Sequence, residues 1–91
     1  MSTIHIQKQH QLDRQTVRKA VESLAEKLST DLSAKYSWEG DRLVFKRSGA
    51  SGHIDIGDGI VDIEIKLGMM LTPLKGQIEQ TVAGYLEERL S

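Results

Sequence analysis

The stretch GHIDIGDGIVDIEIKLG, residues 52–68, holds the side chains of this chain that come nearest to a chemical site. Asp55, Asp62 and Glu64 alternate with aliphatic residues, and His53 stands two positions before Asp55. Carboxylate oxygens are the ligands that hard cations such as Mg²⁺ and Ca²⁺ prefer. A surface metal site formed by these four residues is therefore conceivable, and a metal-dependent hydrolase that uses Asp55, Asp62 and Glu64 is one hypothesis for the function of the chain.

The spacing of these residues nevertheless departs from known metal sites. The run DIGDGIVDIE lacks two ligand positions of the calcium-loop template D-x-[DN]-x-[DN]-G. His5, His10 and His53 are scattered, with no H-E-x-x-H pattern. Strict alternation of acidic and aliphatic residues is typical of a strand with one wet face. We therefore expect solvated carboxylates, and we predict no catalytic residue, no metal ligand and no cofactor.

Composition excludes several other classes of protein. The chain has 91 residues, with 12 Lys and Arg against 13 Asp and Glu, for a net charge of -1. A nucleic-acid binder normally shows a basic excess, so we predict no nucleic-acid partner. The chain has no cysteine, which removes disulfides, thiolate metal sites and cysteine nucleophiles. This length is typical of a single domain, here residues 1–91.

The N-terminal segment MSTIHIQKQHQLD has no apolar run of signal-peptide length. No stretch of the chain approaches the roughly 20 apolar residues that a membrane-spanning helix needs. We therefore expect a cytoplasmic protein without a membrane span.

Residues 3–7 alternate Ile4 and Ile6 with polar residues, which indicates a short strand. The segment after it has apolar residues every three or four positions, as in an amphipathic helix, and Asp13 is the expected N-cap. The apolar positions are Val17, Ala20, Val21, Leu24, Ala25, Leu28 and Leu32. On the other face we expect solvated charges, namely Arg14, Arg18, Lys19, Glu22, Glu26 and Lys27.

Three two-residue turns are predicted within residues 36–67, at Gly40-Asp41, Ser48-Gly49 and Asp58-Gly59. Together they define an antiparallel meander whose apolar residues all share one face, because a slip of one residue would reverse a strand. That dry face would hold Tyr36, Trp38, Leu43, Phe45, Ile54, Ile56, Val61, Ile63, Ile65 and Leu67. The aromatic residues are therefore expected in the core rather than in a stacking platform. The same registers place Asp55 opposite Asp62 and His53 opposite Glu64 on the wet face.

The last segment, LTPLKGQIEQTVAGYLEERL, predicts a second amphipathic helix. Thr72 would be its N-cap and Pro73 its first helical residue. The whole pattern predicts an α+β fold of order β-α-β-β-β-β-α, with two long helices packed on one face of an antiparallel sheet in a helix-grip-like arrangement. The strands around Ile4–Ile6 and Tyr36–Trp38 would be the sheet edges, and either could pair two copies into a homodimer.

A run of bulky apolar residues lies between the predicted sheet and the last helix: Leu67, Met69, Met70 and Leu71. Methionine is common at adaptable apolar surfaces because its side chain is flexible and polarisable. Four such side chains cannot easily face one core from so short a connection. These residues are therefore the candidate apolar contact site, for a polymer surface, a lipid-like ligand or a second copy of the chain.

Three segments together resemble a known family: YSWEGDRLVF, SGASGHIDI and VDIEIKLGMMLTPLKGQIE. The chain resembles the small polyhydroxyalkanoic acid system proteins from about Ile4 to Leu90. The resemblance implies an association with polyhydroxyalkanoate storage polymer in bacteria, through the granule or through granule proteins. It implies no catalytic residues.

Together these observations predict a non-enzymatic accessory protein of the polyhydroxyalkanoate system that acts by granule-surface or protein contact. The alternative is a binding module that grips an acyl chain between helix and sheet. That alternative predicts an internal cavity of about 300 Å³ or more, the usual scale of ligand pockets.

Overall fold

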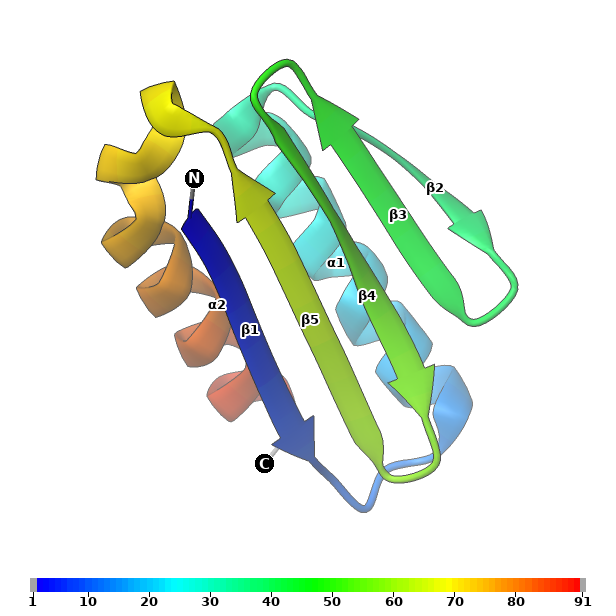
Figure 1. The fold of residues 1–91 in the computed structure, drawn as a ribbon. Coiled ribbons are helices and arrows are strands. Elements are labelled where there is room, and N and C mark those ends of the chain that lie inside the picture. The colour runs from blue at the N-terminus through cyan, green and yellow to red at the C-terminus, as the bar shows by residue number, and fades with distance from the viewer. Residues whose placement is uncertain (1, 91) are drawn as a thin grey trace.

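The computed structural model describes residues 2–90, in which an antiparallel sheet carries two α-helices on the same face (Figure 1). The elements are β1 (Ser2–Gln9), α1 (Arg14–Leu32), β2 (Lys35–Glu39), β3 (Arg42–Arg47), β4 (Ala50–Gly57), β5 (Ile60–Leu67), the 3₁₀ helix η1 (Met69–Leu74) and α2 (Lys75–Leu90). The predicted α+β class is confirmed. The order differs from the expected one by the additional η1 between β5 and α2, and the likeness to a helix-grip arrangement stays a prediction.

The five strands lie in the order β1-β5-β4-β3-β2 and are antiparallel throughout. The predicted registers are confirmed at all three hairpins. The observed pairs include Trp38 with Leu43, Leu43 with Ile54, Ile54 with Ile63, and Ile56 with Val61. Each two-residue turn contains one glycine with positive φ, at Gly40, Gly49 and Gly59. Strands β1 and β2 are the edges, as expected.

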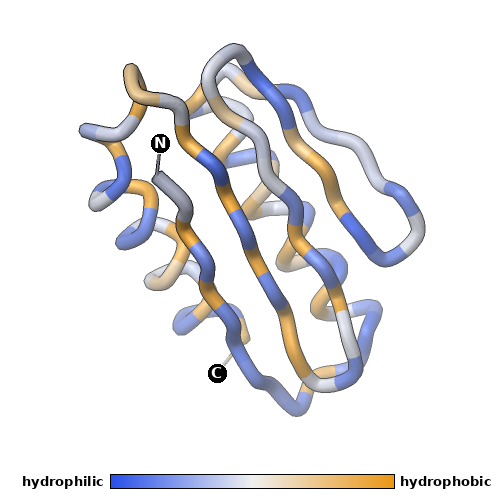
Figure 2. Tube along the Cα trace, in the orientation of Figure 1, coloured by the Kyte–Doolittle hydropathy of each residue, from blue (hydrophilic) through white to orange (hydrophobic). Residues whose placement is uncertain are grey.

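The buried side chains form one hydrophobic cluster between the sheet and the helices. The sheet contributes Ile4, Leu43, Phe45, Ile54, Ile56, Val61, Ile63, Ile65 and Leu67 to it, among others. Helix α1 contributes the predicted apolar stripe, and α2 contributes Ile78, Val82, Leu86 and Leu90. Figure 2 shows the strand pattern behind this core, with hydrophobic and hydrophilic residues alternating along β1, β4 and β5. The two helices therefore bury one face of the sheet and leave the other face exposed to solvent.

Helix α1 begins as predicted at Asp13, which has extended backbone angles. Its carboxylate accepts hydrogen bonds from the backbone amide of Thr16 at 3.2 Å and from the Thr16 hydroxyl at 2.6 Å. The hydroxyl bond lowers the pKa of Asp13, and the amide bond lowers it further, because both stabilise the charged form.

Replacing Asp13 with alanine should lower the melting temperature at neutral pH, because an amide at the start of α1 loses its acceptor. Since folding lowers the pKa of Asp13, its stabilisation is present above the pKa of the unfolded chain and disappears as the pH falls through the lower folded value. Thermal melts should show the gap between wild type and Asp13→Ala closing in acid. Asp13→Asn is the control, because it keeps the acceptor without titrating. A gap that stays constant down to the lowest pH would contradict this assignment.

The predicted start of the second helix is wrong. Thr72 is not its N-cap, and Pro73 lies inside η1, so α2 begins at Lys75. The Thr72 hydroxyl instead donates to the carbonyl oxygen of Gly68 at 3.2 Å, back across the 3₁₀ turn. The Thr-Pro signal is local, whereas contacts with the end of the sheet hold this segment in a tighter turn.

Candidate functional site

The acidic residues singled out in the sequence meet on the exposed sheet face, as predicted. Asp55 lies opposite Asp62 in the register of β4 and β5. The Arg42 guanidinium, from the neighbouring strand, donates to both Asp55 oxygens, at 2.6 and 3.2 Å. On the other side, His5 Nε2 lies 2.6 Å from Asp62 Oδ1. The hydrogen bond from Arg42 to Asp55 and the charge of that carboxylate raise the pKa of the arginine above its usual range.

These contacts explain how two like charges can face each other across a strand pair. Each carboxylate has a basic partner on the side away from the other, so the repulsion is offset by side chains of the sheet itself. His53 is a residue of β4, and its Nε2 lies 3.6 Å from an oxygen of Asp55 on the same strand and 3.9 Å from an oxygen of Glu64 on β5. Among residues 2–90, no three His, Asp or Glu side chains are placed so that they could hold a metal ion. The structure therefore gives the metal-hydrolase hypothesis no support.

The apolar run between β5 and α2 divides into buried and exposed residues. Leu67 is 1% exposed and belongs to the core, so it cannot take part in a surface contact as the sequence reading proposed. Met69 and Met70, at the start of η1, are 81% and 93% exposed. Leu71 is half-buried and packs against the core cluster. We call the two exposed residues, Met69 and Met70, the methionine corner.

The methionine corner stands on a well-braced turn at one end of the sheet (Figure 1). The amide of Gly68 donates to the carbonyl of Gly49, in the β3–β4 turn, at 2.7 Å. The Leu71 side chain lies over the same turn, 3.5 Å from the position that a Cβ on Gly49 would occupy. The Ser2 hydroxyl adds a contact of 3.3 Å to the Thr72 hydroxyl. Contacts from the β3–β4 turn and from β1 thus hold η1 in place, while its two methionines are exposed to solvent.

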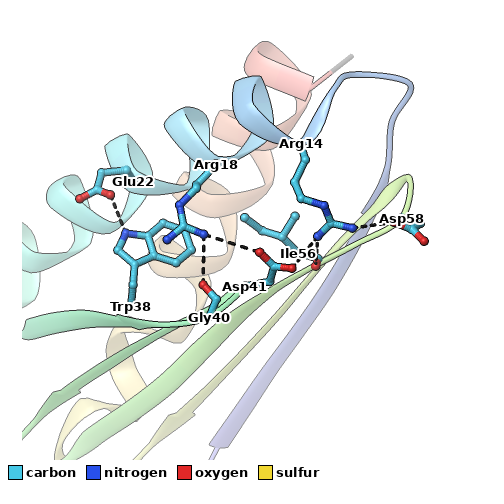
Figure 3. A network of polar contacts seen from close by, with 8 residues as sticks. All are labelled: Arg14, Arg18, Glu22, Trp38, Gly40, Asp41, Ile56 and Asp58. Carbon is cyan, nitrogen blue, oxygen red and sulfur yellow. Dashed lines mark hydrogen bonds and ion pairs between the residues drawn. The ribbon is translucent and has the colours of Figure 1, made fainter.

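A second polar cluster joins α1 to the opposite end of the sheet (Figure 3). Arg14 donates to the Asp41 carboxylate at 2.9 Å, to the Ile56 carbonyl at 3.1 Å and to the Asp58 carboxylate at 2.5 Å. It therefore ties two hairpin turns to the start of the helix. Arg14 is exposed, as expected of a solvated charge, with 44% of its side-chain surface accessible. Its contacts with the two turns were not predicted.

Trp38 is covered by side chains from the same helix face. The Arg18 guanidinium lies 3.8 Å from the centre of the indole ring, a cation–π contact. The indole Nε1–H donates to Glu22 at 2.6 Å. Partial burial of Tyr36, together with the nearby Glu22 carboxylate, raises the pKa of the tyrosine hydroxyl. Trp38 therefore serves to dock the edge strand on α1, and its covered ring is no stacking platform.

Sequence reasoning missed this cluster, although a signal for it was present. Arg14, Arg18 and Glu22 are spaced by four residues, so they share one helix face. That spacing shows which charges lie together, but it does not show that hairpin turns lie beneath them.

A shallow groove separates α1 from α2 near the methionine corner. It is lined by Leu28, Asp31, Leu32, Leu74, Gln77, Ile78 and Thr81, and its volume is about 90 Å³. Ligand pockets usually measure about 300–1,000 Å³. The groove is thus too small to support the acyl-chain alternative.

Within residues 2–90, neither helix is long and apolar enough to cross a membrane. A search of curated proteins gave no match, and neither did a search of solved structures. A family model does match, over residues 4–90, and its description reads "Putative polyhydroxyalkanoic acid system protein (PHA_gran_rgn)". The match covers nearly the whole chain, in agreement with the resemblance seen in the sequence. The chain belongs to this family of polyhydroxyalkanoic acid system proteins.

Proposed function

We propose that the chain is a non-enzymatic accessory protein of the polyhydroxyalkanoate storage system. It acts in the cytoplasm by touching the granule surface, or a granule protein, through the methionine corner. The observation that carries this proposal is the near-complete exposure of Met69 and Met70 on a braced turn. Membership of the family supports the choice of partner.

Exposure of this kind is unusual for side chains that gain free energy by leaving water. Fully burying a methionine side chain is worth about 1.5–3 kcal/mol. Two methionines therefore offer a gross gain of about 3–6 kcal/mol, before the entropy lost on binding is subtracted. Such a contact is weak and reversible, which suits a protein that exchanges on and off a polymer surface.

The other features of the described chain support contact rather than chemistry. Asp55 and Asp62 on the sheet face are engaged by Arg42 and His5. Trp38 is covered by Arg18 and bonded to Glu22. Among residues 2–90, the two residues of the methionine corner are the most exposed of the large apolar side chains.

Co-sedimentation with washed polyhydroxyalkanoate granules tests this proposal. Wild type should pellet with the granules, and Met70→Asp should stay in the supernatant, because a carboxylate cannot leave water without a large cost. Leu12→Asp is the matched control. Leu12 is 37% exposed and lies in the connection between β1 and α1. The amide of His10 in this connection donates to the Gly59 carbonyl, which places the connection at the other end of the strands from the methionine corner.

Both variants should first be checked for a wild-type melting temperature. If wild type fails to pellet, or if Met70→Asp pellets as wild type does, the proposed contact through the corner is wrong. If Met70→Asp and Leu12→Asp lose granule binding to the same extent, the methionine corner is not the specific contact site.

A further inference from the structure

Three lysines form a row across the exposed sheet face. In the register, Lys35 on β2 faces Lys46 on β3, Lys46 faces Ser51 on β4, and Ser51 faces Lys66 on β5. All three lysines are exposed. Neighbouring strands are about 4.8 Å apart, so the three backbone positions lie within about 15 Å. We call Lys35, Lys46 and Lys66 the lysine row.

The lysine row is not neutralised from within the described chain. Across residues 2–90, none of its ammonium groups lies within 4.0 Å of a carboxylate oxygen. Lys35 and Lys46 even face each other directly, an arrangement that destabilises a strand pair unless an anion screens it. Two rows away on the same face, by contrast, Arg42 is matched to Asp55 and His5 to Asp62.

The lysine row lies at the same end of the sheet as the methionine corner. Lys66 precedes Met69 by three residues, and Lys46 lies beside the β3–β4 turn whose Gly49 carbonyl holds Gly68. The acidic turn residues Asp41 and Asp58 lie at the opposite end, where Arg14 binds them. On the helix side of the η1 end, Asp31 lines the interhelical groove. Within residues 2–90, the lysines of the sheet face that lack a carboxylate partner therefore lie toward the corner, whereas Arg42 farther along the face is paired with Asp55.

We propose that the lysine row and the methionine corner act together on a lipid layer that carries anionic headgroups. This inference rests on the proposed surface contact and adds the charge of the surface. A short apolar contact holds a protein on a lipid layer only marginally, and a basic patch supplies the second attraction. Each lysine near an anionic surface strengthens binding about fivefold, and salt screens this attraction.

The direct test measures binding to vesicles of phosphatidylglycerol and, in parallel, to vesicles of phosphatidylcholine. The full chain should bind the first and not the second. Raising the ionic strength from about 0.01 M to about 0.15 M shortens the Debye length from about 30 Å to about 8 Å, so binding should fall steeply. The double variant Lys46→Glu, Lys66→Glu should bind phosphatidylglycerol at least about 25-fold more weakly than wild type.

The matched control is Lys19→Glu, Lys27→Glu, which makes the same change in net charge at two exposed residues of α1. It should bind almost as wild type does. Equal weakening in the two double variants would mean that net charge alone acts, and the inference would be wrong. Equal binding to both kinds of vesicle, or no binding to either, would also overturn it. So would full binding by Met70→Asp, because the corner would then play no part.

Lipid-free polymer granules separate this inference from the proposed function. Lys46→Glu, Lys66→Glu should still pellet with bare polymer, whereas Met70→Asp should not. The wild-type chain could pellet with bare polymer, in a way that depends on Met70, and still not bind phosphatidylglycerol. The proposed function would then hold and the lipid inference would be wrong.

Discussion

Replacing Gly52 with alanine is expected to destabilise the fold by about 1–3 kcal/mol, the usual cost of overpacking a core. A Cβ at this position in β4 would lie 2.6 Å from the carbonyl oxygen of Glu64 and 2.8 Å from Cζ of the Phe45 ring. The Phe45 side chain is buried, and the carbonyl belongs to the paired strand β5. Neither neighbour can move without disturbing the sheet, so we expect the upper part of this range.

Urea denaturation measures this effect, with Gly76→Ala as the control. Nothing lies within 4 Å of a Cβ built on Gly76, which belongs to α2. Alanine there should stabilise the protein by up to about 1 kcal/mol, because glycine is a poor helix former. The two glycine replacements should thus shift the urea midpoint in opposite directions. A midpoint for Gly52→Ala at or above that of wild type would show that the sheet accommodates the methyl group and that the close approach has no structural role.

Replacing Leu24 with alanine is expected to cost about 2–5 kcal/mol, the range for cavities left by large-to-small changes in a core. Leu24 is fully buried in the part of α1 that covers the sheet. A domain of this kind has a total stability of about 5–15 kcal/mol, so the change removes a large fraction of it. Equilibrium unfolding in urea should show a lower midpoint with a similar slope.

Met70→Ala serves as the comparison for Leu24→Ala, since both truncate a large apolar side chain. Met70 is almost fully exposed, so its truncation should change stability by no more than about 0.5 kcal/mol. Stability and granule binding should therefore separate, with Leu24 affecting the first and Met70 the second. A loss of stability in Met70→Ala as large as in Leu24→Ala would show that Met70 is part of the core, and the proposed contact site would lose its basis.

The sequence was sufficient to predict the four-stranded meander β2–β5 and the registers of its three hairpins. Strand side chains alternate with a period of two, and each predicted turn contained a glycine that can take positive φ. These local features placed Asp55 opposite Asp62 before any long-range contact was known. They did not give the register of β1, whose Ile4 pairs with Ile65. The start of α1 followed in the same way, since Asp13 caps an amide only three residues away.

The candidate site could be predicted only in part. The sequence identified the run from Leu67 to Leu71, but the structure decided that Leu67 is buried while Met69 and Met70 are exposed. That division depends on the β3–β4 turn, where the Gly49 carbonyl accepts from Gly68 and Leu71 packs alongside. The same contacts shift the start of α2 to Lys75, past the local Thr-Pro signal.

Periodicity and turn chemistry thus determined which residues of this chain share a face. Only the tertiary structure decided which charges on those faces are neutralised. Arg42 meets Asp55 on the next strand, Arg14 reaches two turns far along the chain, and Lys46 and Lys66 meet no carboxylate in residues 2–90. The physical reason is the distance along the chain over which each interaction acts. Alternation and capping act over a few residues, whereas an ion pair or an exposed corner depends on segments that only the finished fold brings together.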